Sequence, residues 1–174
     1  MYSICEKDSV RLLEDAPQPS VTAPSQAVYA TGERLLAAYY VQDTGGNYAE
    51  AVAPDLGAGM IGFPVAVINF VEPAAHLFCP PAAEVLSRHP LAERGLEPFG
   101  VYEVRDSSWV RQLARLSPAH KVERTAAARH YVFTFYDQVF ECAARGFNCV
   151  LRFGSVAEVL QCVLKKSEDK PGLG

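Results

Sequence analysis

Apolar residues fall in short runs and alternations along this chain, a pattern typical of β-strands. Glycine, proline or polar turn residues separate one run from the next, as expected where strands end. Residues 43–47, Asp-Thr-Gly-Gly-Asn, predict a tight hairpin turn. Strands are predicted at residues 27–31, 34–41, 48–52, 64–71, 75–79, 131–136, 139–144 and 147–153.

Helices are predicted between these strands from their caps and apolar stripes. The first follows Pro80-Pro81 and ends near residue 88, because proline is tolerated in the first turn of a helix. The second begins at a polar cap among residues 106–108 and runs to residue 116, and a third covers residues 123–129. Ser155 and Glu158 form a capping box that starts a C-terminal helix. This order predicts an α+β fold with a curved, mostly antiparallel sheet, short helices packed on one side, and a helix after the last hairpin.

The two ends of the chain lack the apolar patterning of the middle. Residues 16–26 contain three prolines and no charged residue, so residues 1–26 are expected to form a flexible arm. A short helix at residues 9–15 that docks elsewhere is the alternative. A single α+β domain is expected at residues 27–166, followed by a frayed tail at residues 167–174.

Composition adds limits on function. The chain of 174 residues is 49% hydrophobic and 21% charged, which is typical of a globular domain that needs no metal or disulfide for stability. With 16 Lys and Arg against 20 Asp and Glu, its formal net charge is −4. Binding to nucleic acid by charge alone requires clustered basic residues, so no nucleic-acid partner is expected.

A cytoplasmic location without membrane association is expected. The first residues show no basic start followed by an apolar run, and the longest apolar stretch, residues 60–71, is too short to cross a bilayer. The five cysteines are odd in number and include no Cys-x-x-Cys pair, which favours reduced, mostly buried thiols. Cys142 and Cys149 are both expected to be buried structural thiols.

Two familiar patterns carry no chemistry here. Residues 57–62 match Gly-x-Gly-x-x-Gly, but Pro64 and a strand-like run follow where a dinucleotide-binding loop needs a helix. The four histidines show no spacing typical of a zinc site. The sequence therefore predicts neither a metal nor a cofactor.

The hairpin around Asp137 and Gln138 gives the clearest candidate site. With these two residues as the turn, alternation along the strands places the aromatic residues on one face and polar residues on the other. Histidine and a carboxylate on one face suit acid–base work, because imidazole titrates near neutral pH. His130 and Glu141 are therefore the predicted catalytic pair. The predicted substrate-binding residues are Thr134, Tyr136, Arg145, Glu103 and Trp109. The alternative is that this strip is the solvent face of an antiparallel sheet.

The blocks His89-Pro90-Leu91, Gly95-Leu96, Ser107-Ser108-Trp109-Val110 and the segment from His130 to Cys142 occur in a recognisable order. This order resembles a group of small bacterial proteins of unassigned function that share an HPL…GL…SSW[IV]…F.D..FEC pattern. The resemblance covers roughly residues 65–150 and implies no activity. It does single out five residues as a set: His89, Trp109, His130, Asp137 and Glu141.

Three functional hypotheses remain open on the sequence alone. In the first, the polar strip is a small-molecule site with acid–base catalysis of the isomerase, lyase or hydrolase type. There His130 and Glu141 transfer protons while Thr134 or Tyr136 orients the substrate. In the second, the domain is a non-catalytic accessory or immunity-like factor that binds a protein partner, with a homodimer as one form. In the third, it binds a ligand without turnover.

Overall fold

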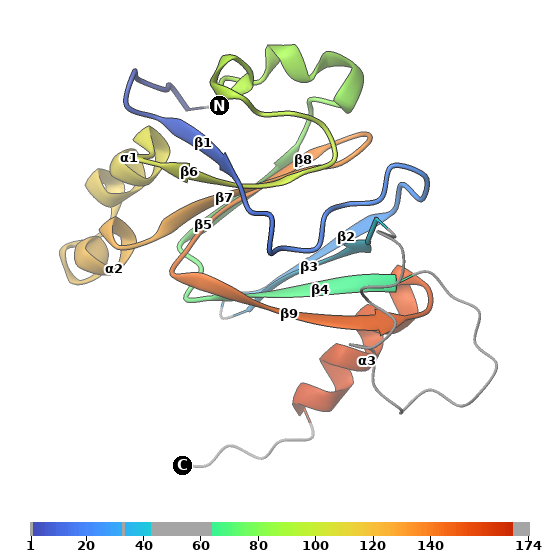
Figure 1. Ribbon diagram of the computed structural model, residues 1–174. Helices are drawn as coiled ribbons and strands as arrows, with labels where there is room; N and C mark the ends of the chain where they lie inside the picture. Colours follow the sequence, from blue (N-terminus) through green and yellow to red (C-terminus); the bar gives the residue numbers. More distant parts are fainter. Residues whose placement is uncertain (1, 33, 43–63, 169–174) are drawn as a thin grey trace.

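Two antiparallel sheets packed face to face form the framework of the protein (Figure 1). The computed structural model describes residues 2–32, 34–42 and 64–168. The five-stranded sheet has the order β1 (Ser9–Leu12), β6 (Val101–Arg105), β7 (Arg129–Thr134), β8 (Val139–Ala144) and β5 (Ala75–Cys79). The four-stranded sheet has the order β2 (Gln26–Ala30), β3 (Leu35–Tyr40), β4 (Pro64–Val71) and β9 (Gly146–Phe153). The predicted α+β class is confirmed, with the strands divided between two sheets.

The chain passes from one sheet to the other at two neighbouring corners. One corner joins β4 to β5 through Glu72, whose φ of 48° lies in the left-handed region. The other joins β8 to β9 at Arg145, whose backbone N–H donates to the Val71 carbonyl at 3.0 Å. The Arg145 guanidinium also lies 3.2 Å from the Glu72 carboxylate. The two corners therefore hold each other in place.

Aromatic side chains fill the space between the sheets. Phe70 of the four-stranded sheet packs against Phe133 and Phe140 of the five-stranded sheet, at ring-centroid distances of 5.8 and 5.5 Å. Tyr39 meets Phe133 edge to face at 5.9 Å. Cys142 is fully buried in this core, and burial raises the pKa of its thiol, so it is the structural thiol that alternation predicts.

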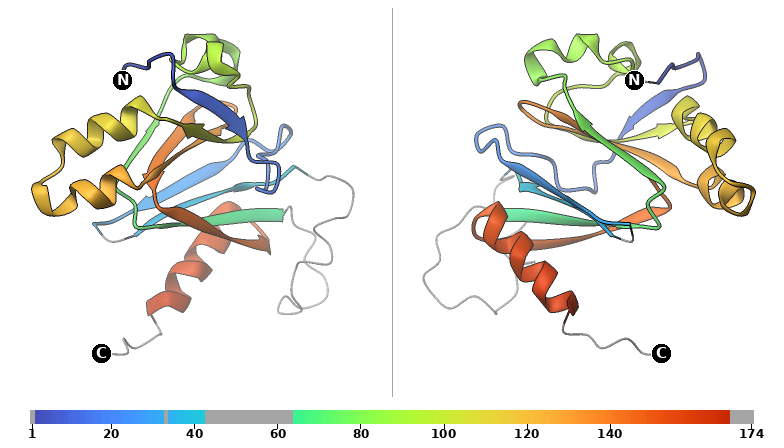
Figure 2. Two further views of the ribbon diagram at one scale, coloured as in Figure 1. Left: turned by 60° about the vertical axis from the view of Figure 1, so that its left-hand side comes forward. Right: turned by 180° about the vertical axis from the view of Figure 1, so that it is seen from behind.

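The outer face of the four-stranded sheet is covered by α3 (Val156–Glu168), as Figure 2 shows. Val156 and Val159 of this helix are buried against Ala38, Val65 and Val67. Its N-terminus has the predicted capping box. The Glu158 N–H donates to Ser155 Oγ, and the Ser155 N–H donates to the Glu158 carboxylate.

The outer face of the five-stranded sheet is also covered. Short elements lie over it (Figure 1): η1 (Ala83–Arg88), η2 (Ala92–Arg94), α1 (Ser108–Leu116), η3 (Ala119–Lys121) and α2 (Val122–Ala126). Trp109 and Val110 of α1 are buried with Val104 and Val132 of the sheet. The polar strip around His130 is therefore not a solvent face.

The N-terminal segment is part of the fold, contrary to the expected flexible arm at residues 1–26. Residues 9–12 form strand β1, not a helix, and pair with β6. Tyr2 and Asp8 are buried, and the Asp8 carboxylate accepts hydrogen bonds from the Cys5 and Ser108 N–H groups. The proline-rich run that follows lies against the domain, since the Tyr39 hydroxyl donates to the Pro17 carbonyl at 2.7 Å. Tertiary contacts thus order a segment whose local sequence gives no sign of it.

The hairpin register differs from the prediction by two residues. Thr134 pairs with Val139, so residues 135–138 form a four-residue connection in place of the predicted two-residue turn. An even shift keeps every side chain on its predicted face. His130 and Glu141 therefore do lie on one face, and Phe133 and Phe140 lie on the other.

Several smaller predictions also change. Residues 83–88 form a 3-10 helix, and α2 ends at Ala126, before β7 begins. Trp109, Leu113 and Leu116 predict one apolar face on the helix that ends at residue 116, but Leu116 is 77% exposed. Cys149 is exposed where alternation predicts burial. The predicted turn at 43–47, the strand at 48–52 and the glycine motif at 57–62 lie outside the described residues. Of the predicted tail at residues 167–174, the first two residues belong to α3 and the others lie outside the described residues. Within the described ranges, no helix is long and apolar enough to span a membrane.

Candidate active site

A buried carboxylate on β8 is the centre of the candidate site. Glu141 is only 2% exposed, and its carboxylate accepts three hydrogen bonds, from the neighbouring strand and from two more distant segments. His130 Nε2 on β7 lies 2.8 Å from Oε2, and the Tyr2 hydroxyl donates to the same oxygen. His89 Nε2, just after η1, lies 3.4 Å from Oε1. A β-strand, a 3-10 turn and the N-terminal segment therefore meet at one charged group.

The hydrogen bonds fix which ring nitrogens carry protons. The Leu91 N–H donates to His89 Nδ1 at 3.2 Å, so Nε2 is the protonated nitrogen that faces Glu141. In the same way, the carboxylate can only accept, so the His130 Nε2 that faces it carries a proton. In the neutral ring, His130 Nδ1 accepts a hydrogen bond on its other side.

Ser107 occupies that side. Its Oγ lies 2.9 Å from His130 Nδ1 and accepts the Val110 N–H at 3.2 Å, so the hydroxyl both caps α1 and donates to the imidazole. The sequence places it there through a sharp turn. β6 ends at Arg105, and Asp106 adopts a φ of 50° before the helix begins at Ser108. Such strain in a non-glycine residue is found preferentially at functional sites.

Glu141 is ionised at neutral pH. Burial alone raises the pKa of a carboxyl group, but the hydrogen bonds from His130, His89 and Tyr2 outweigh it and lower the pKa of Glu141 to about 2. Burial and the neighbouring Glu141 charge together raise the pKa of Tyr2, which keeps its hydroxyl protonated as a donor. The site therefore holds one buried negative charge surrounded by donors.

Aromatic rings close one side of this network. The Trp109 ring lies 4.8 Å from the His130 ring in an edge-on arrangement, and Tyr2 stacks on Trp109 at 5.5 Å. Among the described residues, no buried side-chain nitrogen or oxygen lacks a hydrogen-bond partner. The imidazole is thus fixed in orientation by packing as well as by hydrogen bonds.

A cleft of about 500 Å³ lies on the other side, beside Ser107 and His130. Ser107 is 7% exposed, whereas His130 is fully buried. Charged side chains of both signs line the cleft: Glu103, Arg105, Asp106, Arg111 and Arg129. Among Ser107, His130 and Glu141, the serine is therefore the most exposed residue.

The structure brings together some of the predicted site residues. His130 and Glu141 are in direct contact, Trp109 packs on His130, and Glu103 lines the neighbouring cleft, where it pairs with Arg129 at 2.7 Å. The remaining predicted binding residues, Thr134, Tyr136 and Arg145, lie elsewhere.

Each of these has another environment. Thr134 is buried at the far end of β7, where its hydroxyl donates to the Glu97 carbonyl and accepts the Gly100 N–H. Tyr136 is 49% exposed in the hairpin connection, and Arg145 pairs with Glu72 at the corner between the sheets. Asp137 lies in the same connection and accepts a hydrogen bond from the Gln26 side chain.

Reasoning from the sequence missed two members of the network. The sequence marks Ser107 as a helix cap and as part of the resemblance, and Tyr2 has no local signal at all. It marks His89 as the end of a helix and as part of the resemblance, and not as a partner of Glu141. No group of three or more His, Cys, Asp or Glu side chains in the described segments is arranged to hold a metal ion.

Comparison with known proteins identifies no relative. No protein-family model matches the chain, and no curated protein or solved structure matches it significantly. The candidate function therefore rests on the geometry of the site.

Proposed function

We propose that the protein is a hydrolase of small acyl compounds, with Ser107 as nucleophile, His130 as general base and Glu141 as the carboxylate that orients the imidazole. The observation that carries this proposal is the continuous relay across one ring. Ser107 Oγ lies 2.9 Å from His130 Nδ1, and His130 Nε2 lies 2.8 Å from Glu141 Oε2. Serine, histidine and a carboxylate in hydrogen-bond sequence are the arrangement that activates a hydroxyl for acyl transfer.

The proton path follows from the protonation of the ring. Ser107 Oγ attacks the acyl carbon, and its proton passes to His130 Nδ1. The resulting imidazolium is stabilised by the Glu141 carboxylate and then gives the proton to the leaving group as the acyl bond breaks. Water attacks the acyl-serine in the second half of the reaction and loses a proton to the same nitrogen. His130 then returns that proton to Ser107 Oγ as the acyl–serine bond breaks, which releases the free acid and regenerates the Ser107 hydroxyl. The ring nitrogens serve in the opposite order from serine proteases, where Nε2 faces the serine.

The cost of the network also supports a functional role. Taking an ionised carboxylate out of water costs several kcal/mol, and well-packed apolar residues often give equal or greater stability at such a site. Clusters of ionisable groups with perturbed pKa values occur preferentially at functional sites. The buried and ionised Glu141, with two histidines hydrogen-bonded to it, is thus better explained by chemistry than by stability.

The cleft suggests the kind of substrate. Arg105, Arg111 and Arg129 line it against the acidic Glu103 and Asp106, so its formal charge is slightly positive. The Arg111 guanidinium also donates to the hydroxyl of Ser108 at 2.8 Å, and Ser108 follows the proposed nucleophile in the chain. An acyl compound with an anionic group fits these charges best.

A fluorophosphonate probe tests the proposal, because it reacts covalently with an activated serine and hardly at all with ordinary serines. The expected result is one added probe group on the folded protein, mapped by peptide mass spectrometry to Ser107. Ser107→Asn retains the capping ability of the side chain and should abolish labelling. His130→Gln and Glu141→Gln should slow the labelling of Ser107 by at least about tenfold, because general-base catalysis typically contributes a rate factor of that size or more.

Ser87→Ala, an exposed residue of η1, is the matched control and should label as the native protein does. Circular dichroism of each variant confirms that it is folded. The proposal is wrong if the folded native protein is not labelled at Ser107. It is also wrong if labelling proceeds at the same rate in the folded His130→Gln variant.

A further inference from the structure

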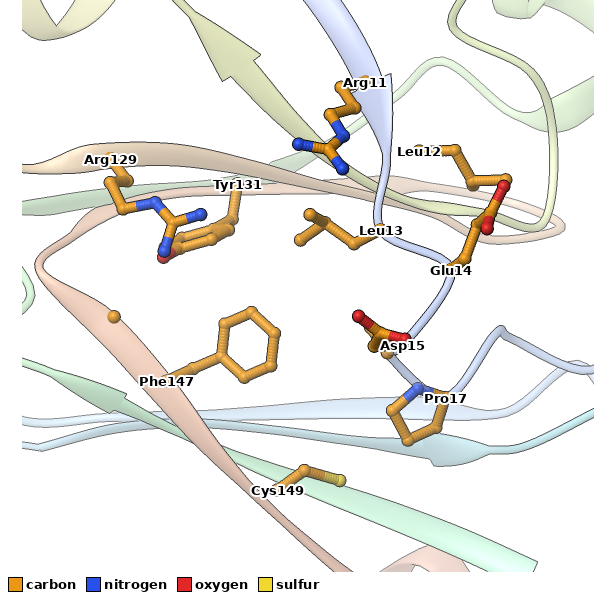
Figure 3. Close-up of a pocket in the computed structure, with 12 residues that line it drawn as sticks. Arg11, Leu12, Leu13, Glu14, Asp15, Pro17, Arg129, Tyr131, Phe147 and Cys149 are labelled. Carbon is orange, nitrogen blue, oxygen red and sulfur yellow. The ribbon is translucent and has the colours of Figure 1, made fainter. Parts of the chain in front are cut away.

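A second cleft, of about 610 Å³, lies between the N-terminal segment and the first residues of β7 and β9 (Figure 3). Residues 11–17 form one wall, and Arg129, Tyr131, Phe147 and Cys149 form the other. It shares only Arg129 with the cleft beside Ser107. The proposed hydrolase reaction does not use it.

Two arginines supply positive charge along one side. Arg129 is held by Glu103 through two hydrogen bonds of 2.7 Å, and its guanidinium lies 5.3 Å from the Tyr131 ring centre. Arg11 is directly opposite Glu103 in the pairing of β1 with β6, and its side chain extends towards the cleft in Figure 3. Within the described part of the chain, Arg11 has no ion pair within 4.0 Å. Two arginines against one glutamate leave this side with a net positive charge.

Apolar and acidic groups complete the cleft. The rings of Phe147 and Tyr131 pack edge to face at 5.1 Å, and Leu13 lies nearby (Figure 3). The exposed Asp15 carboxylate faces the same space in Figure 3. A positive group, an aromatic wall and a carboxylate therefore follow one another across a single cleft.

We propose that this cleft binds a small zwitterion with an apolar group, such as a free aromatic α-amino acid. The ligand carboxylate pairs with Arg11, its ammonium group pairs with Asp15, and its side chain packs on Phe147. A ligand with a carboxylate alone would be repelled by Asp15 and Glu14, and a ligand with an amine alone would be repelled by Arg11 and Arg129. Each of these ligands should therefore bind more weakly than a zwitterion. Arginine is suited to the carboxylate because its fork offers two parallel N–H donors.

Isothermal titration calorimetry with L-phenylalanine is the direct test, with phenethylamine and 3-phenylpropionate as ligands that each lack one charged group. L-phenylalanine is expected to bind at millimolar concentration or below, and each analogue at least about tenfold more weakly, since each loses an ion pair. Arg11→Gln and Asp15→Asn should each weaken L-phenylalanine binding by about tenfold. Arg115→Gln, an exposed arginine of α1, should leave it unchanged.

The proposal is overturned if the folded native protein shows no binding at about 10 mM L-phenylalanine. This concentration lies above the dissociation constant that two ion pairs should give. It is also overturned if 3-phenylpropionate or phenethylamine binds as tightly as the amino acid. Equal binding by the folded Arg11→Gln variant and the native protein would exclude this site. None of these outcomes depends on reactivity at Ser107.

Discussion

His130 and Glu141 reach each other diagonally across two neighbouring strands. In the pairing of β7 with β8, His130 lies opposite Ala143 and Glu141 lies opposite Val132, yet His130 Nε2 is 2.8 Å from Glu141 Oε2. Diagonal neighbours on one face of a sheet are within reach of long side chains. The small Ala143 leaves the space into which the imidazole and the carboxylate extend.

The charge on Glu141 should make stability depend on pH in the acid range. Its pKa is about 2 when folded and 4.5 as the ordinary value, so the folded state favours the ionised form. This contribution is complete above about pH 4.5 and is lost as the pH falls towards 2, in total about 3 kcal/mol. Urea unfolding at a series of pH values measures it. Glu141→Gln should flatten the curve over this range, and an unchanged acid dependence in that variant would contradict the assignment.

Glu141→Gln should also lower stability at neutral pH. The variant leaves His130, His89 and Tyr2 directed at an amide in place of a carboxylate, at a cost of about 3 kcal/mol in the free energy of unfolding. Chemical denaturation at pH 7 gives the value. Glu103→Gln is the control, because its pair with the half-exposed Arg129 should contribute less than about 1 kcal/mol.

Tyr2→Phe isolates one hydrogen bond of the network. The ring contacts with Trp109 and His130 persist, but the hydroxyl that donates to Glu141 is lost, at an expected cost of about 1–2 kcal/mol. Because that bond helps to lower the pKa of Glu141, the acid unfolding midpoint should move to higher pH. Thermal unfolding at pH 7 and at pH 4 measures both effects. A variant as stable as the native protein at both pH values would show that this hydrogen bond does not contribute to stability.

Phe140→Ala tests the core between the sheets. Phe140 is fully buried against Phe70 and Phe133, so its loss leaves a cavity and should cost about 3–5 kcal/mol. Leu116→Ala removes a similar apolar group from a side chain that is 77% exposed, and it should change the unfolding free energy by less than about 0.5 kcal/mol. Equal costs at the two positions would mean that the sheets do not pack as described.

Much of the framework follows from local sequence. The period of two residues is sufficient to place most described strands within a few residues, and it puts His130 and Glu141 on one face even though the hairpin register is shifted by two. The capping box at Ser155 and the cap at Ser107 also follow directly from residue type and spacing.

What covers that face does not follow from local sequence. A sheet face is polar or buried according to which distant segment lies on it, and Tyr2 and Asp8 come from a segment whose composition suggests disorder. For the same reason the role of Ser107 beside His130 depends on the packing of α1 against β7. Strand alternation predicts that Cys149 is buried, and this prediction is wrong. Cys149 lines the cleft beside the edge strand β9, so no other side chain of the described residues covers it.

The hydrogen bond between Tyr2 and Glu141 also has a consequence for the order of folding. The two residues are 139 positions apart in the chain. During synthesis the N-terminal residues leave the ribosome long before β8 exists, and contacts between such distant positions form late and slowly. Until then the five-stranded sheet against which Tyr2 and β1 pack is incomplete. The contact between Tyr2 and the charged centre is therefore expected to form late, after the β7–β8 hairpin has brought His130 and Glu141 together.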